Sequence, residues 1–132
     1  MRLKDVESKL PNGFHDAKIN TISRNLKEEL VEIHLDILSG LPDDERDRQN
    51  EVRQGVLRIK GAKIVVVEEP DVDSPFAYPG SVNFVLTEDE PGSIADSLLK
   101  KLNCECHTYT FFIQEWLSNV KIVATDLEFT WS

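Results

Sequence analysis

The clearest pattern in the chain is a run in which apolar and polar residues alternate. From Val31 to Ile37 every odd-numbered residue is aliphatic, and every even-numbered residue is acidic or histidine. Period two is the period of a β-strand with one face buried and the other in water, whereas a helix would scatter these apolar residues around its circumference. Residues 17–24 form a second such segment shortly before it. The short link between the two predicts an antiparallel hairpin.

Further strand-like segments follow along the chain. They are residues 56–59, 62–67, 82–86, 108–116, 120–124 and 127–131. Gly61 separates the first two, and the continuous run Ile64–Val67 predicts burial on both faces of its strand. The apolar phase changes between Ala124 and Leu127, which predicts a bulge near Thr125 and Asp126.

Two segments have helical spacing. Leu3, Val6 and Leu10 predict a short helix that ends at Pro11-Asn12-Gly13. Residues 93–102 begin with a capping serine and carry an apolar stripe. The polar residues 40–54 read as an exposed loop or a turn of solvated helix. The chain is therefore expected to be one α+β domain over residues 1–132, mainly antiparallel β-sheet of six to eight strands with one or two short helices, as a sheet layered with a helix or a small sandwich.

Composition and charge narrow the class of protein. The 132 residues fit one domain, and 40% apolar residues exclude general disorder. The chain carries 15 Lys+Arg against 24 Asp+Glu, a net charge of −9. This charge disfavours nucleic acid and anionic lipid as partners and favours a basic protein. The charged opening residues and the lack of a long apolar run predict a cytoplasmic protein that does not enter a membrane.

The two cysteines, Cys104 and Cys106, are one residue apart. On a strand they share a face, a spacing that suits a direct disulfide poorly, so reduced thiols are expected. Together with His107 they supply too few ligands for a structural zinc site. No metal and no cofactor are predicted.

His15 and Asp16 are the first candidates for chemistry. They lie between a Pro-Asn-Gly turn and a strand, where a histidine beside an aspartate is able to act as a tuned base. The plainer interpretation is that Asp16 caps backbone amides and His15 anchors the loop. No phosphate-binding glycine loop, nucleophile elbow or HExxH motif is present, so no catalytic residue is assigned.

Acidic loop residues and one tryptophan are the candidate binding residues. The set is Asp43, Asp44, Glu45, Glu68, Glu69, Asp71 and Trp116. Acidic loops keep a protein soluble, and they also recognise a basic partner where several converge on one face. Trp116 and Trp131 belong to the core or serve as exposed anchors of an interface. Glu32, His34 and Asp36 read as a solvent-facing row.

Three parts of the chain carry a resemblance. They are Leu10–Ala17 (Leu-Pro-Asn-Gly-Phe-His-Asp-Ala), Gly55–Gly61 with Val66–Pro70, and Phe111–Asn119 followed by Ala124–Asp126 and Phe129–Trp131. The sequence resembles a family of small uncharacterised bacterial proteins that open with a Gly-Phe-His-Asp-Ala element, and more loosely small immunity proteins of bacterial toxin systems. The resemblance implies bacterial origin and a compact β-rich fold, and it supplies no catalytic residues.

Three functions are therefore considered. The first is a non-enzymatic, cytoplasmic, immunity-like module that binds a basic protein through its acidic surface. The second is a small enzyme or ligand-binding protein with a pocket around His15 and Asp16. The third is a homodimer that pairs through an edge strand or through the region of Trp116 and Trp131.

Overall fold

The computed structural model describes residues 2–14, 17–41, 45–46, 51–68, 87–88, 106–113 and 118–132. In chain order the elements are α1 (Leu3–Ser8), β1 (Lys18–Asn25), β2 (Leu30–Leu38), β3 (Val52–Lys60), β4 (Ile64–Val67), β5 (Thr87–Glu88), β6 (His107–Ile113), β7 (Ser118–Ala124) and β8 (Asp126–Trp131). The predicted strand at 82–86 and the predicted helix at 93–102 lie outside these residues.

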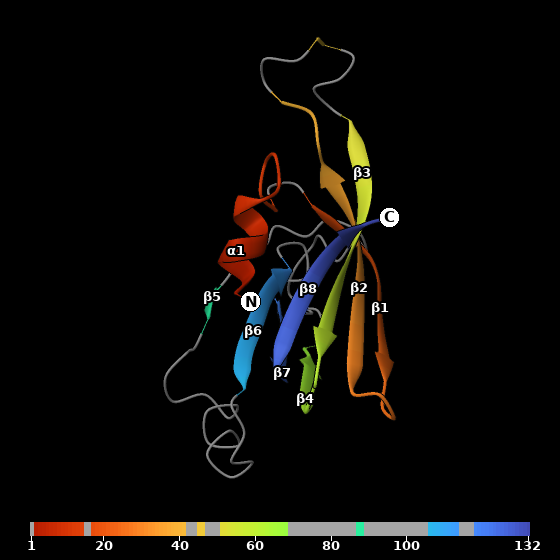
Figure 1. Cartoon of the computed structure of the whole chain (residues 1–132), viewed down its shortest axis with the longest axis vertical. Helices are drawn as coiled ribbons and strands as arrows, with labels where there is room; N and C mark the ends of the chain where they lie inside the picture. The colour runs from red at the N-terminus through yellow and green to blue at the C-terminus, as the bar shows by residue number, and fades with distance from the viewer. Residues whose placement is uncertain are drawn as a thin grey trace.

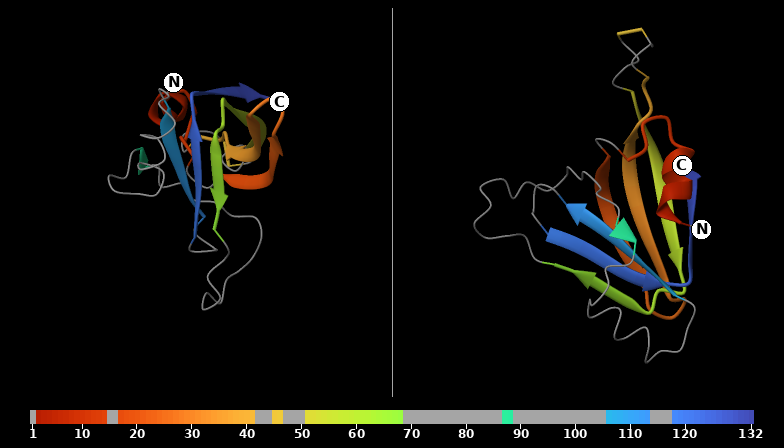
Figure 2. Two further views of the ribbon diagram at one scale, coloured as in Figure 1. Left: turned by 90° about the horizontal axis from the view of Figure 1, so that it is seen from below. Right: turned by 90° about the vertical axis from the view of Figure 1, so that its left-hand side faces the viewer.

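The strands form two four-stranded antiparallel sheets (Figure 1). Sheet A has the order β1-β2-β3-β8, and sheet B has the order β4-β7-β6-β5. The right-hand view of Figure 2 shows the strands of sheet B slanting across those of sheet A. A mostly antiparallel, sheet-rich α+β fold with a short helix is thus confirmed.

Strand β2 holds the centre of the core, as its alternation predicts. Val31, Ile33, Leu35 and Ile37 are all fully buried, while the residues between them are exposed or half-buried. The same cluster includes residues of β3, β6, β7 and β8. One face of each sheet therefore packs into a single apolar core.

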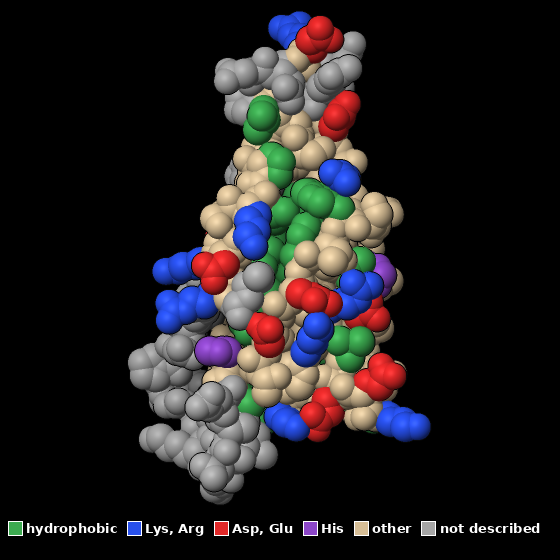
Figure 3. Space-filling view, viewed as in Figure 1, with side chains coloured by type: hydrophobic (Ala, Val, Ile, Leu, Met, Phe, Trp, Pro, Cys, Tyr) green, Lys and Arg blue, Asp and Glu red, His purple; other side chains and the backbone are tan. Residues whose placement is uncertain are grey.

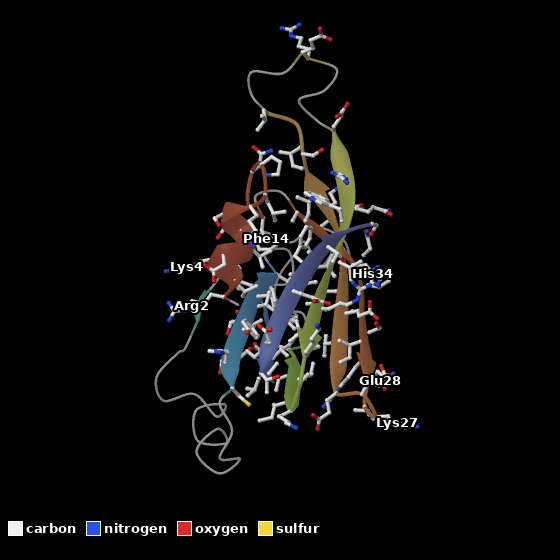
Figure 4. The ribbon with its side chains drawn as sticks, viewed as in Figure 1. Arg2, Lys4, Phe14, Lys27, Glu28 and His34 are labelled. Carbon is white, nitrogen blue, oxygen red and sulfur yellow. The ribbon has the colours of Figure 1, made fainter. Side chains whose placement is uncertain are left out.

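The helix and the turn after it add to that core from the N-terminal side. Leu3 and Val6 of α1 are buried at helical spacing, and Leu10 and Phe14 continue the same contact. Figure 4 shows the Phe14 side chain between α1 and the strands. The predicted helix at 3–10 is thus confirmed, with its last turn opening after Ser8.

Two strands of one sheet continue into the other sheet at one place, which we call the corner (residues 60–64 and 123–126). Strand β3 passes into β4 and β7 passes into β8, and these pairs are neighbours in both sheets. Three residues connect Lys60 to Ile64, whereas two connect Val123 to Asp126. Lys63 donates its amide to the Val123 carbonyl at 2.8 Å, so the extra residue lies on the β3–β4 side as a bulge.

Gly61 and Thr125 hold the corner together. The Thr125 amide and hydroxyl both donate to the Lys60 carbonyl, each at 3.0 Å. Gly61 has a φ of +64°, and a Cβ there would lie 2.2 Å from the Thr125 hydroxyl oxygen. Only glycine meets both conditions without strain. The break predicted at Gly61 and the phase change predicted near Thr125 therefore both belong to the corner, where the two residues contact each other.

The structure corrects two sequence-based boundaries and one prediction of burial. Strand β3 begins at Val52, inside the predicted polar loop, because β2 extends to Leu38 and pairs with it. Strand β5 occupies Thr87–Glu88, directly after the predicted strand at 82–86. The predicted burial of β4 on both faces is wrong, because β4 lies at the edge of sheet B and exposes its last two valines.

Gly61→Ala is expected to lower the free energy of unfolding by about 2 kcal/mol, because alanine disfavours the left-handed backbone and its methyl group meets Thr125. Urea denaturation checks this value. A Thr125→Ala background removes the two closest atoms, the hydroxyl oxygen and Cγ2, and leaves only the Cβ at 3.1 Å, so the same substitution is expected to cost only about 1 kcal/mol. Equal costs in both backgrounds would contradict the packing role of Thr125.

Gly55 provides a second prediction. The Phe129 ring occupies the space where a side chain at position 55 would lie, and a Cβ added at Gly55 would be 2.4 Å from the ring. Gly55→Ala is expected to displace that ring from the core and destabilise the fold by about 1–3 kcal/mol. Thermal denaturation of Gly55→Ala with and without Phe129→Leu measures the coupling. If the destabilisation of the double variant equals the sum of the two single variants, the position of the Phe129 ring does not depend on Gly55.

Candidate functional site

The structure describes two of the predicted site residues, Glu45 and Glu68. The others lie outside the described residues: His15, Asp16, Asp43, Asp44, Glu69, Asp71 and Trp116. The pocket predicted around the His-Asp pair therefore stays a prediction, as does the interface role of Trp116.

Glu45 and Glu68 are both exposed, but the fold places them far apart. The described segment 45–46 lies at the tip above the β2–β3 hairpin, at the top of Figure 1. Glu68 directly follows β4, which lies in the lower half of the same view. These two acidic groups therefore do not form one patch.

The charge of the protein is unevenly divided between the described residues and the rest. The described residues hold 12 Lys+Arg and 12 Asp+Glu, so this part of the chain is net neutral. The remaining residues hold 3 Lys+Arg and 12 Asp+Glu and carry the whole net charge of −9.

On the outer face of sheet A, basic side chains form ion pairs with acidic ones. Arg58 contacts the Glu32 carboxylate at 3.4 Å and donates to the Thr130 hydroxyl at 3.0 Å. Two residues further along β3, the Lys60 ammonium group lies 3.0 Å from the Glu128 carboxylate on β8. Figure 3 shows Lys and Arg side by side with Asp and Glu on the face that it draws. Pairs this exposed contribute little stability.

His34 lies in the same outer face. Its Nε2 is 4.0 Å from the Glu32 carboxylate, and its side chain is exposed. Figure 4 shows it pointing away from the side of the molecule that holds α1 and β6. Asp36, two residues on, accepts from the Asn20 amide at 2.9 Å. The row expected to face solvent does so, and its groups are engaged with their strand neighbours.

The described part of the Leu10–Ala17 element is structural. The Asn12 side-chain amide donates to the Leu38 carbonyl at 3.0 Å and to the Gly40 carbonyl at 2.7 Å. Gly13 has a positive φ of 57°, and the Ala17 amide donates to the Phe14 carbonyl at 3.1 Å. These contacts fix the turn after α1 against the end of β2.

Trp131 packs against the core as a half-buried residue. The Phe129 ring meets it edge-on at 5.1 Å, and the Arg53 guanidinium lies 4.5 Å from the centre of its ring. Such contacts hold an aromatic ring in place on a sheet face. The prediction that Trp131 belongs to the core is favoured over an exposed anchor.

Cys106 is disulfide-bonded, contrary to the reduced thiols expected from the sequence. The only other cysteine of the chain, Cys104, lies outside the described residues. Within the part of the chain that is described, no group of three His, Cys, Asp or Glu side chains is placed to hold a metal ion. No helix among those residues is long and apolar enough to cross a membrane.

The feature that sequence analysis missed is the edge strand β4. Val66 is 46% exposed and Val67 is 48% exposed, although the run Ile64–Val67 is wholly aliphatic. A continuous apolar run does not by itself separate a buried strand from an edge strand. The signal that indicates an edge is its short length between charged residues, Lys63 on one side and Glu68 on the other.

Comparison with known proteins found no match to the chain among family models, curated proteins or solved structures. The function must therefore be argued from the arrangement of residues alone.

Asn12→Ala is expected to destabilise the protein by about 1–2 kcal/mol, because two partly buried carbonyls lose their donor. Asn20→Ala is the matched control. Its single hydrogen bond to Asp36 is exposed, so the loss is expected to stay below about 0.5 kcal/mol. Urea denaturation of both variants gives the comparison. Equal losses would show that the Asn12 contacts do not hold the N-terminal turn.

Proposed function

We propose that the protein is a non-enzymatic protein-binding module whose acidic segments receive a basic protein, in the manner of an immunity protein. The observation that carries the proposal is the division of charge. On sheet A, Arg58 pairs with Glu32 and Lys60 pairs with Glu128, whereas the sequence between Lys63 and Lys100 carries acidic residues without any Lys or Arg.

This division favours recognition for a physical reason. Acidic residues needed only for solubility have no reason to gather in particular stretches. Between Lys63 and Lys100 the sequence contains no Lys or Arg, yet it contains eight Asp and Glu residues. A stretch of one sign raises the association rate with a basic partner and rejects acidic ones. The similarity to immunity proteins remains a prediction from the sequence.

A second acidic group lies between β2 and β3. It includes Asp43, Asp44 and Glu45, with Glu45 exposed at the tip of the molecule. Arg46 and Arg48 follow in the same stretch and reduce its net charge. The residues after β4 are therefore the better candidates for the principal contact with a basic protein.

The test is capture of a basic protein from extract of the source cells, followed by titration with that protein once purified. Glu68→Gln/Glu69→Gln/Asp71→Asn is expected to weaken binding about tenfold at low salt, at about 0.3–0.5 kcal/mol for each lost ion pair. The wild-type affinity is expected to fall between low and moderate salt.

Glu28→Gln/Glu32→Gln/Glu128→Gln is the matched control, because it removes three negative charges from sheet A and its β1–β2 turn. It is expected to change the affinity less than about threefold, the effect of net charge alone. Binding that is equally weak in both triple variants would assign the effect to total charge. Failure to retain any basic protein at either salt concentration would reject the proposal.

A further inference from the structure

The described residues leave one side of strand β4 without a neighbouring strand. It is the first strand in the order β4-β7-β6-β5, and among the described residues β7 is its sole neighbour. In an antiparallel pair, alternate residues turn their amide and carbonyl groups away from the partner strand. An edge strand therefore offers a row of hydrogen-bonding groups to any extended segment that lies beside it.

The ladder shows which residues face outward. The Glu68 amide donates to the Asn119 carbonyl at 3.0 Å, so residues two and four before it, Val66 and Ile64, also bond to β7. Val65 and Val67 then direct their backbone groups to the open side. These are the backbone groups that an added strand would bond.

The side chains at this edge are apolar rather than protective. Natural edge strands are commonly guarded by a very short length, charged residues, proline or a bulge, and β4 is itself short, with four residues between Lys63 and Glu68. Here the bulge and the lysine both lie before β4, at the corner, and the exposed residues are Val66 and Val67 on opposite faces. An added strand would cover both side chains.

The charge around β4 indicates which kind of extended segment is able to pair with it. Glu68 is exposed directly after β4, and the sequence that follows is acidic with no Lys or Arg until residue 100. A second copy of the chain would bring −9 against −9 and the same acidic stretch, which opposes pairing. An extended segment with Lys or Arg next to its apolar residues meets no such repulsion.

We propose that the open edge of β4 docks an extended apolar segment of the basic partner, which adds to sheet B as an antiparallel strand. Antiparallel addition places the N-terminal end of the added segment beside Glu68. The partner segment therefore carries its Lys or Arg residues immediately before its alternating apolar ones. This inference rests on the proposed function and names the site at which it operates.

The probe is a fluorescent peptide of three lysines followed by Val-Thr-Val-Thr-Val, titrated with the full chain by anisotropy. Val67→Pro removes an outward amide without removing a bond to β7, and it is expected to weaken binding about tenfold. Val67→Thr is the matched control, because it keeps the amide and the β-branched shape. It is expected to bind within about twofold of the wild type.

Two further arms remain informative where a variant folds poorly. The same peptide with alternate amides N-methylated is expected to lose binding to the unchanged protein, because its hydrogen bonds to β4 are blocked. Glu68→Lys is expected to weaken the lysine peptide about three- to tenfold and to strengthen a peptide that begins with three glutamates. Absence of peptide binding at millimolar concentration overturns the proposal.

The remaining outcomes separate this inference from the proposed function. If Val67→Pro still binds the purified basic protein fully, the acidic segments act without β4 and the docking strand is rejected. If light scattering shows a dimer that Val67→Pro disrupts, the occupant is a second copy. If amide exchange shows Val65 and Val67 protected in the isolated monomer, another segment of this chain covers the edge. Each of these results overturns the docking strand.

Discussion

The architecture depends on one contact between distant parts of the chain, in which Thr125 lies against the bare backbone of Gly61. Here the β3–β4 strand and the β7–β8 strand turn together from sheet A into sheet B. The Thr125 bonds to the Lys60 carbonyl satisfy the backbone where the ladder is interrupted. Because both sheets share these strands, the corner sets the angle at which their apolar faces meet and so defines the core between them.

The sequence predicts the parts of this fold that depend on local pattern. Alternation in β2 identifies its buried residues correctly, because period two has one structural meaning when one face is in water. The break at Gly61 and the phase change after Ala124 are also visible. Their meeting in space is not predictable from either, since it depends on strand order. The start of β3 at Val52 is missed for a similar reason, because its pairing with Leu38 outweighs the polar residues around it.

The candidate site is predictable only in part, and the limit again lies in position within a sheet. Four aliphatic residues from Ile64 to Val67 look the same in sequence whether one or two strands flank them. Their exposure follows from the place of β4 at the end of sheet B. Glu45 and Glu68, which composition groups together as acidic, lie far apart, because segment 45–46 is at the tip beyond β2 and β3 whereas Glu68 directly follows β4. The strand order therefore indicates the exposed edge of β4 with Glu68, and not a patch that joins Glu45 to Glu68, as the candidate binding surface.

The Thr125–Lys60 contact joins residues 65 positions apart in the sequence. Strands β1, β2 and β3 follow one another as a meander, so they are able to assemble from neighbouring contacts, whereas the corner must wait until a long loop has closed. Closing such a loop becomes only slowly more costly with length, by about 0.6 kcal/mol for each doubling. The number of residues between Lys60 and Thr125 is therefore able to change over evolutionary time at little cost in the free energy of folding, provided that the strands of sheet B, β5 included, keep their pairing.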